Sequence, residues 1–236
     1  MLKKRIIYSV STAIFLAVET LLGYILQTGS GRTINTAQYI SVILAFLFCF
    51  LFFEKSFDYL FTQLALFITV IADYFLVWLS PQIKLWGMFF FFFAQLSYAA
   101  RIYFSEKNAK KRLGQIISRV FLTVAIVIIT LIVLKDGADM LSIVSMMYYA
   151  NLALNLFWSV FDIKKHYILA AAFLFFVGCD TLIGISVLKQ YFTIPPDSFI
   201  YKILYPGFDL AWAFYLPSQM LLAISLLPNR LKSKKD

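Results

Sequence analysis

The sequence carries little charge for its length. Only 14% of its 236 residues are Asp, Glu, Lys or Arg, and 62% are hydrophobic. An average soluble domain has about 25% charged residues. A soluble domain of this size has too little interior to hide so much apolar surface. The composition therefore excludes an ordinary soluble domain and predicts a chain whose surface is solvated by lipid.

Cysteine and histidine are nearly absent, and their scarcity excludes two further classes. Cys49 and Cys179 both lie in apolar runs, so they are expected to act as small apolar residues and not as a disulfide framework. His166 is the sole histidine, which leaves few ligands for a zinc site built on several His and Cys. We therefore expect no metal site and no cofactor.

Long apolar runs dominate the sequence instead. A membrane-spanning helix needs about 20 mostly apolar residues, because each residue rises ~1.5 Å across a hydrocarbon core ~30 Å thick. Runs of about this length cover residues 6–26, 36–53, 58–80, 84–104, 118–135, 139–160, 167–188 and 207–227. The prediction is an all-α transmembrane bundle of eight spans that forms one integral membrane domain, residues 1–236.

The basic residues fall unevenly on the two sides of such a bundle. Of the 21 Lys and Arg, one side receives all except Arg32, Lys84, Lys135, Lys189 and Lys202. Cytoplasmic loops are enriched in Lys and Arg. The asymmetry favours N-in, C-in orientation in a bacterial cytoplasmic (inner) membrane. It also attributes the net charge of +9 to topology, so no nucleic-acid partner is expected.

Two aspartates inside the spans are the strongest functional candidates, because a charge near the bilayer centre costs ~2.5–3.5 kcal/mol. Asp73 lies 15 residues after Asp58, and Asp180 lies 14 residues after His166. Both spans run outward from the cytoplasmic side. At ~1.5 Å per residue, both carboxyls are therefore expected ~21–22 Å from that edge. Two carboxyls at one depth can share a site.

The other polar residues in the spans have competing interpretations. Glu19 and Asp209 lie nearer span ends and can reach the interface. Asn151 and Asn155 are four residues apart on one helical face, where hydrogen bonding between helices is favoured over the lining of a cavity. Arg101, near the cytoplasmic end of its span, is expected to snorkel to the interface.

A weak internal duplication runs through these residues. The segment 71–76, which contains Asp73, is followed in the next span by Gln95. The segment 178–183, which contains Asp180, is likewise followed by Gln219. Four spans separate the copies, so both halves have the same orientation. The pattern predicts a 4+4 parallel repeat with a site between the halves.

These segments resemble the YhhN family, which includes the TMEM86 lysoplasmalogenases. The family succession Gly-Asp-x-x-Leu, Gly and Phe-x-x-x-His-x-x-Tyr is similar to Ala72-Asp73-Tyr74-Phe75-Leu76, Gly87, Phe93-Ala94-Gln95 and Tyr98. Its Phe-x-x-Ser-Asp-x-x-Leu and Tyr-x-x-x-Gln elements are similar to the stretches from Phe175 to Leu182 and from Tyr215 to Gln219. Ala72, Cys179 and Gln95 depart from the usual Gly, Ser and frequent His.

The resemblance implies hydrolysis of the vinyl-ether bond of an alkenyl lysophospholipid. The products would be a fatty aldehyde and a glycerophospho-choline or -ethanolamine. Asp73 and Asp180 would be the catalytic acid and base, in either assignment, as in glycosidases with a similar transition state. The residues expected to position water or the glycerol hydroxyl are Gln95, Tyr98, Asn151, Tyr215 and Gln219.

Two other functions fit the same residues. A small transporter or lipid-binding membrane protein would use the buried Asp pair to bind a cation or a proton. A purely structural membrane protein would use each neutral Asp to hydrogen-bond a neighbouring helix. The sequence has neither a Gly-x-Ser-x-Gly elbow nor a His-Glu-x-x-His motif, so other hydrolase classes are poorly supported. It assigns no oligomeric state.

Overall fold

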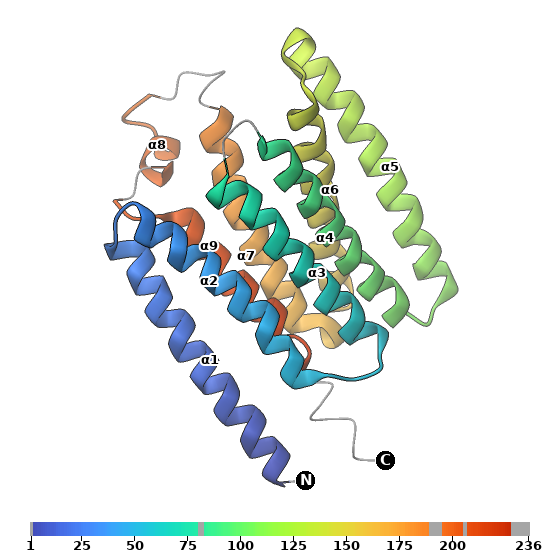
Figure 1. Cartoon of the computed structure of the whole chain (residues 1–236). Coiled ribbons are helices and arrows are strands. Elements are labelled where there is room, and N and C mark those ends of the chain that lie inside the picture. Colours follow the sequence, from blue (N-terminus) through green and yellow to red (C-terminus); the bar gives the residue numbers. More distant parts are fainter. Residues whose placement is uncertain (1, 80–82, 189–194, 205–206, 228–236) are drawn as a thin grey trace.

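The computed structural model describes residues 2–79, 83–188, 195–204 and 207–227, and long helices run side by side through it (Figure 1). No strand occurs in these ranges. The elements are α1 (Leu2–Thr28), α2 (Arg32–Phe48), η1 (Cys49–Phe52), α3 (Phe57–Asp73), η2 (Tyr74–Trp78), α4 (Lys84–Ser105), α5 (Ala109–Leu134), η4 (Lys135–Gly137), α6 (Met140–Phe161), α7 (Ile163–Leu188), α8 (Phe199–Leu204) and α9 (Leu210–Ile224). The all-α prediction is confirmed for this part of the chain.

Seven helices, α1 to α7, are long and apolar enough to cross a membrane, counting the short turns that extend some of them. The chain is therefore a multi-pass membrane protein. The eighth predicted run contains α9, an apolar helix of 15 residues that packs along α7 (Figure 1).

Several helices begin or end away from the predicted positions. α5 begins at Ala109, although residues 105–117 read as a polar connection. The reason is a cap: the Asn108 side chain accepts the backbone N–H of Lys110 at 2.9 Å and of Lys111 at 3.3 Å. Such bonds satisfy donors that a helix start leaves open. The predicted connection over 189–206 likewise contains α8, and its residues 189–194 and 205–206 lie outside the described part.

Six helices, α2, α3, α4, α6, α7 and α9, supply most of the core. α3 packs on α4, α4 on α6, α6 on α7 and α7 on α9, and α9 also contacts α3. The largest buried side chains between them include Tyr98, Phe173 and Phe176. α1 and α5 lie on the outside (Figure 1), where α1 packs on α2 and α9, and α5 packs chiefly on α6.

Basic residues concentrate at one end of the bundle, here called the basic end. The α2–α3, α4–α5 and α6–α7 connections lie there, and α1 begins and α9 ends at the same end (lower end in Figure 1). The described basic residues in or near these connections are Lys55, Arg101, Lys107, Lys110, Lys111, Arg112, Arg119, Lys164 and Lys165. The opposite end has Arg32, Lys84, Lys135 and Lys202.

A close contact between α7 and α9 depends on Gly178. A Cβ atom added there would lie 2.7 Å from a ring carbon of Phe214, whereas one added at Gly184 on the same helix would meet nothing within 4 Å. We expect Gly178→Ala to lower the free energy of unfolding by about 1–3 kcal/mol through overpacking. Gly184→Ala is the matched control and is expected to be neutral or slightly stabilising. Thermal unfolding in detergent measures both, and equal effects would contradict the contact.

Candidate functional site

The two predicted aspartates each accept a hydrogen bond from a tyrosine on another helix. Asp73 is the last residue of α3 and is 4% exposed. Its Oδ2 accepts the hydroxyl of Tyr215 on α9 at 2.6 Å. Asp180 on α7 is partly buried, and its Oδ2 accepts the hydroxyl of Tyr148 on α6. These four residues are called the Asp–Tyr cluster below.

One aromatic centre joins the two pairs. The ring of Tyr148 lies 5.5 Å from that of Phe91 and 6.5 Å from that of Phe176, measured between centroids. Tyr215 lies 6.5 Å and 5.4 Å from the same two rings. The pair expected at one depth is therefore brought into one neighbourhood.

The helix that carries Asp73 changes its geometry at that residue. η2, Tyr74–Trp78, is a π-helical turn that follows Asp73 directly. Such turns are rare and occur frequently at functional sites, because they redirect side chains relative to the rest of the helix. The end of α3 thus resembles a functional site in its backbone as well as in its side chains.

Two of the predicted positioning residues, Gln95 and Asn151, belong to a second polar group. Asn155 Nδ2 donates to Gln95 Oε1 and to its backbone oxygen, both at 2.9 Å. Arg119 on α5 donates to Asn155 Oδ1 at 2.7 Å and to Asn151 Oδ1 at 3.3 Å. These four residues are called the Arg119 cluster. They join α4, α5 and α6, as expected for asparagines that bond between helices.

Tyr98 and Gln219, the remaining positioning candidates, contact neither aspartate through a hydrogen bond in the described part of the chain. Tyr98 is buried edge-on against Phe173, with centroids 5.4 Å apart. Gln219 Nε2 donates to Ser218 at 3.3 Å. Within the described residues, the Tyr98 hydroxyl, Gln219 Oε1 and Gln95 Nε2 are buried without a hydrogen-bond partner. These three atoms can still bond a water or a ligand.

Two residues of these clusters were not predicted. Tyr148 lies three residues before Asn151, hence on nearly the same face of α6, and that spacing within a span is a signal that sequence reasoning can use. Arg119 entered the sequence argument only as one of the basic residues that set the topology. Its place within an apolar run was the overlooked signal.

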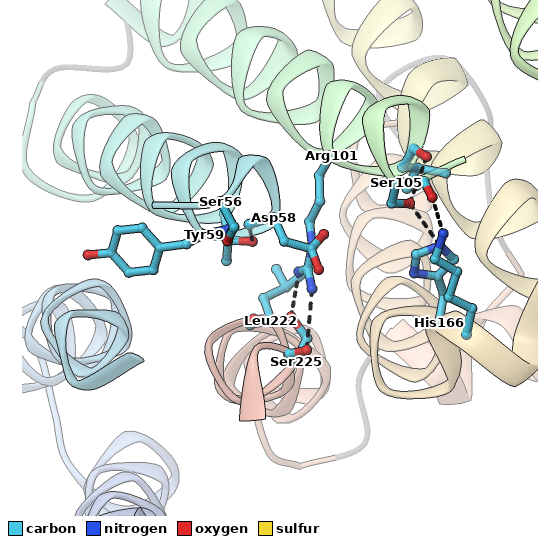
Figure 2. Close-up of polar contacts among 11 residues, drawn as sticks. Ser56, Asp58, Tyr59, Arg101, Ser105, His166, Leu222 and Ser225 are labelled. Carbon is cyan, nitrogen blue, oxygen red and sulfur yellow. Dashed lines mark hydrogen bonds and ion pairs between the residues drawn. The ribbon is translucent and has the colours of Figure 1, made fainter. Parts of the chain in front are cut away.

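Arg101 is buried at the basic end, so the expectation that it snorkels is wrong. It is 3% exposed, and Figure 2 shows its side chain between Asp58 and Ser225. Its Nε lies 3.2 Å from Asp58 Oδ1, and its terminal nitrogens donate to Ser225 Oγ at 2.6 Å and to Ser225 O at 3.3 Å. Buried charges need such partners. These contacts tie α3, α4 and the end of α9 together.

Glu19 does not reach the interface either. It is 0% exposed, and its Oε2 accepts the hydroxyl of Ser41 on α2 at 2.6 Å. Asp209 caps α9 by accepting the backbone N–H of Trp212 at 3.0 Å. Neither residue belongs to the Asp–Tyr cluster.

A small cavity of about 40 Å³ lies beside the Arg101 contacts and is lined in part by Lys165 and His166. It is large enough for water. His166 Nε2 lies 3.2 Å from Ser105 Oγ (Figure 2), and Lys165 Nζ donates to the Ser105 carbonyl.

Outside the spans, the backbone N–H of Asn108 bonds Glu106 at 2.7 Å and holds the pKa of that carboxyl below its ordinary value.

The fold and these clusters define a multi-pass helical membrane protein with an aspartate pair inside the bundle. In comparisons with known proteins, no family model, curated protein or solved structure matches the chain. No three His, Cys, Asp or Glu side chains are grouped for a metal ion in the described ranges. The functional argument therefore depends on the residues themselves.

Proposed function

We propose that the protein is a lysoplasmalogenase-like hydrolase, which cleaves the vinyl-ether bond of an alkenyl lysophospholipid at the Asp–Tyr cluster. The observation that carries this proposal is the pairing of two intramembrane carboxyls, each bonded to a tyrosine, around one aromatic centre. The resemblance of the surrounding segments to the YhhN family adds the substrate class.

The proposed chemistry needs one protonated and one ionised carboxyl. The protonated Asp donates its proton to the β-carbon of the vinyl ether, which leaves an oxocarbenium ion. The ionised Asp stabilises that cation and orients a water molecule, as in glycosidases. Water adds to the cation and loses a proton to the carboxylate. The resulting hemiacetal then collapses to the aldehyde and the glycerophospho alcohol.

The tyrosines would hold each carboxyl in position. Each donates to one carboxyl oxygen, Oδ2, so Oδ1 is the oxygen expected to face substrate or water. Asp180 is the more exposed of the two aspartates, and it is therefore the one that a lipid reaches first.

Removing either tyrosine hydroxyl is expected to slow turnover. The variant that loses the bond to the ionised carboxyl, Tyr148→Phe or Tyr215→Phe, should lower kcat about tenfold to a hundredfold, since a hydrogen bond to a charged group contributes about 1.5–3 kcal/mol, and the other should lower it about twofold to tenfold. Tyr149→Phe is the matched control, because the Tyr149 hydroxyl bonds Thr181 at 2.8 Å and not an aspartate. Steady-state aldehyde release measures all three. Equal rates for the Tyr148 and Tyr149 variants would contradict the assigned role.

We propose further that α9 is the eighth span and that both termini face the cytoplasm of a bacterial inner membrane. α1 begins and α9 ends at the basic end (Figure 1), as an even number of crossings requires. A 4+4 repeat, in which α1, α2, α3 and α4 correspond to α5, α6, α7 and α9, is supported by the packing of the helices. In the first half α1 packs on α2, α2 on α3 and α3 on α4, and in the second half α5 packs on α6, α6 on α7 and α7 on α9. Between the halves, α2 packs on α9, and the corresponding helix α6 packs on α4.

The test of function is release of a fatty aldehyde. The purified protein in detergent is incubated with alkenyl lysophospholipids of choline and ethanolamine, and the aldehyde is trapped as a hydrazone. We expect aldehyde from the wild-type protein only, with the Asp73→Asn/Asp180→Asn double variant as the blank. A folded wild-type protein that yields none with either headgroup, across pH, would overturn the hydrolase.

The matching helix neighbours also favour a second candidate, a small transporter with a site between parallel repeats. Its Asp pair would bind a proton or a cation. Proton-coupled uptake into proteoliposomes, abolished by the same double variant and without aldehyde release, is the result that would favour it.

A further inference from the structure

Arg119 is a cation in an apolar span without an acidic partner. Within the described part of the chain, no carboxylate lies within 4.0 Å of its guanidinium, and its bonds go to the neutral amides of Asn151 and Asn155. These bonds use two of the five N–H donors of an arginine. Ionisable groups inside membranes generally have a partner or a ligand. The site therefore carries one uncompensated positive charge.

Arg119 lies near the basic end of its span. The apolar segment Ala109–Gly137 has 29 residues and is ~43 Å long, which exceeds the ~30 Å hydrocarbon core. Its basic first turn, with Lys110 and Lys111, therefore extends into the interface. Arg119 is ten residues from the start of α5, or ~15 Å along the axis. Because the segment exceeds the core by only ~13 Å in all, Arg119 lies inside the edge of the hydrocarbon, and its long side chain can reach toward the headgroups.

α5 is also the helix past which a lipid can approach. Its buried residues are Gln115 and Thr130 alone, and it stands at the outside of the bundle (Figure 1). Arg119 itself is partly exposed. A lipid in the same leaflet thus reaches the guanidinium without moving the core helices.

The Arg119 cluster and the Asp–Tyr cluster lie along the same side of α6. Tyr148, Asn151 and Asn155 lie on one side of α6 at spacings of three and seven residues, so ~4.5 Å and ~10 Å of helix separate the asparagines from the tyrosine that bonds Asp180. In a glycerol lysophospholipid, five bonds separate the phosphorus from the sn-1 ether oxygen. At about 1.5 Å per bond, they span no more than roughly 7 Å.

We propose that the Arg119 cluster binds the phosphate of a lysophospholipid and thereby places its sn-1 ether bond at the Asp–Tyr cluster. This inference rests on the proposed function for the identity of the reacting bond, but phosphate recognition can be tested without turnover. Arg119 binds the phosphate, and Asn151 and Asn155 hold the guanidinium. Arginine suits this role because its planar fork of donors matches phosphate oxygens.

The experiment measures binding of two non-hydrolysable ligands to the purified full-length protein by calorimetry. One is a 1-O-alkyl lysophosphatidylcholine, and the other is the corresponding 1-O-alkylglycerol, which has no phosphate. We expect the wild-type protein to prefer the phospholipid. Arg119→Gln should weaken phospholipid binding about ten- to a hundredfold, since charge-assisted bonds are lost, and should leave alkylglycerol binding unchanged.

Two further variants control for charge and folding. Lys110→Gln removes the same charge from an exposed position on α5 and is expected to bind both ligands as the wild type does. Arg119→Lys keeps the positive charge but replaces the planar guanidinium with a single ammonium group. Its affinity for the phospholipid should therefore lie between the affinities of the wild type and of Arg119→Gln. If Arg119→Gln does not give a monodisperse protein, the Arg119→Lys series decides the question.

The outcomes separate this inference from the proposed hydrolase. Phosphate-dependent binding that requires Arg119, without aldehyde release, supports the phosphate site and overturns the hydrolase. The phosphate site is overturned if phosphate-bearing and phosphate-free alkenyl lipids release aldehyde with the same KM. It is also overturned if Arg119→Gln lowers the affinity for the phospholipid and for the alkylglycerol by the same factor. Displacement of the phospholipid by inorganic phosphate at equal concentration would assign the site to free phosphate and overturn the lipid assignment.

Discussion

Asp73→Asn and Asp180→Asn are each expected to reduce aldehyde release by roughly a thousandfold, within the range that general acid–base groups contribute. Asparagine keeps the size of the side chain and an oxygen for the tyrosine hydroxyl, but it can neither donate the carboxyl proton nor carry the negative charge. Both variants should therefore fold and bind lipid while the chemical step fails. The measurement is kcat for an alkenyl lysophospholipid in detergent.

The matched control for these variants is Glu19→Gln. Glu19 is also a buried carboxyl in a span, and its hydrogen bond to Ser41 can be kept by a glutamine oxygen. Its replacement should leave kcat within about twofold of the wild type, which separates loss of the reacting carboxyl from loss of any buried acid. Full activity in both aspartate variants would contradict the mechanism.

Asp58→Asn is expected to lower the free energy of unfolding by about 3 kcal/mol, because it leaves the Arg101 guanidinium buried without its counterion. Arg101 is 3% exposed and Asp58 is 24% exposed. The effect should therefore lie at the low end of the range for buried ion pairs. Unfolding by dodecyl sulfate in mixed micelles, followed by circular dichroism, gives the difference.

An exposed ion pair at the same end provides the comparison. Lys111 Nζ lies 3.8 Å from Glu106, and the Lys111 side chain is 39% exposed, so Lys111→Met should cost less than about 1 kcal/mol. The double variant Asp58→Asn/Arg101→Met should cost less than the sum of its two single variants, since it removes both charges together. Additive costs would show that the ion pair does not couple α3 to α4.

Hydropathy was sufficient to predict most of the long helices. Lipid demands long apolar segments, so seven of the predicted runs coincide with helices of spanning length. Counting residues along two helices also predicts one level for Asp73 and Asp180, and the tyrosines that bond them pack on the same two aromatic rings. Depth along a helix is a one-dimensional quantity, which a sequence contains directly.

The side of each helix that contacts its neighbours could not be predicted in the same way. A span that is apolar on almost every side, such as the one with Asp180, gives no periodic signal for the side that faces its neighbours. Hence Tyr148 was missed as the partner of Asp180. Arg101 was expected at the interface, and Glu19 was considered able to reach it, because their positions near span ends allow it. The tilt and contacts of neighbouring helices bury them instead.

The bond between Asp73 and Tyr215 joins residues 142 positions apart, and this separation has a consequence for biosynthesis. Ribosomes add about 5–20 residues per second, so the Asp73 carboxyl is synthesised roughly 7 to 28 s before the tyrosine that bonds it. During that interval, a growing chain with several inserted helices holds an aspartate without its final partner. A chain that terminates before α9 never completes the pair. Synthesis of α9 thus determines whether Asp73 belongs to a finished site.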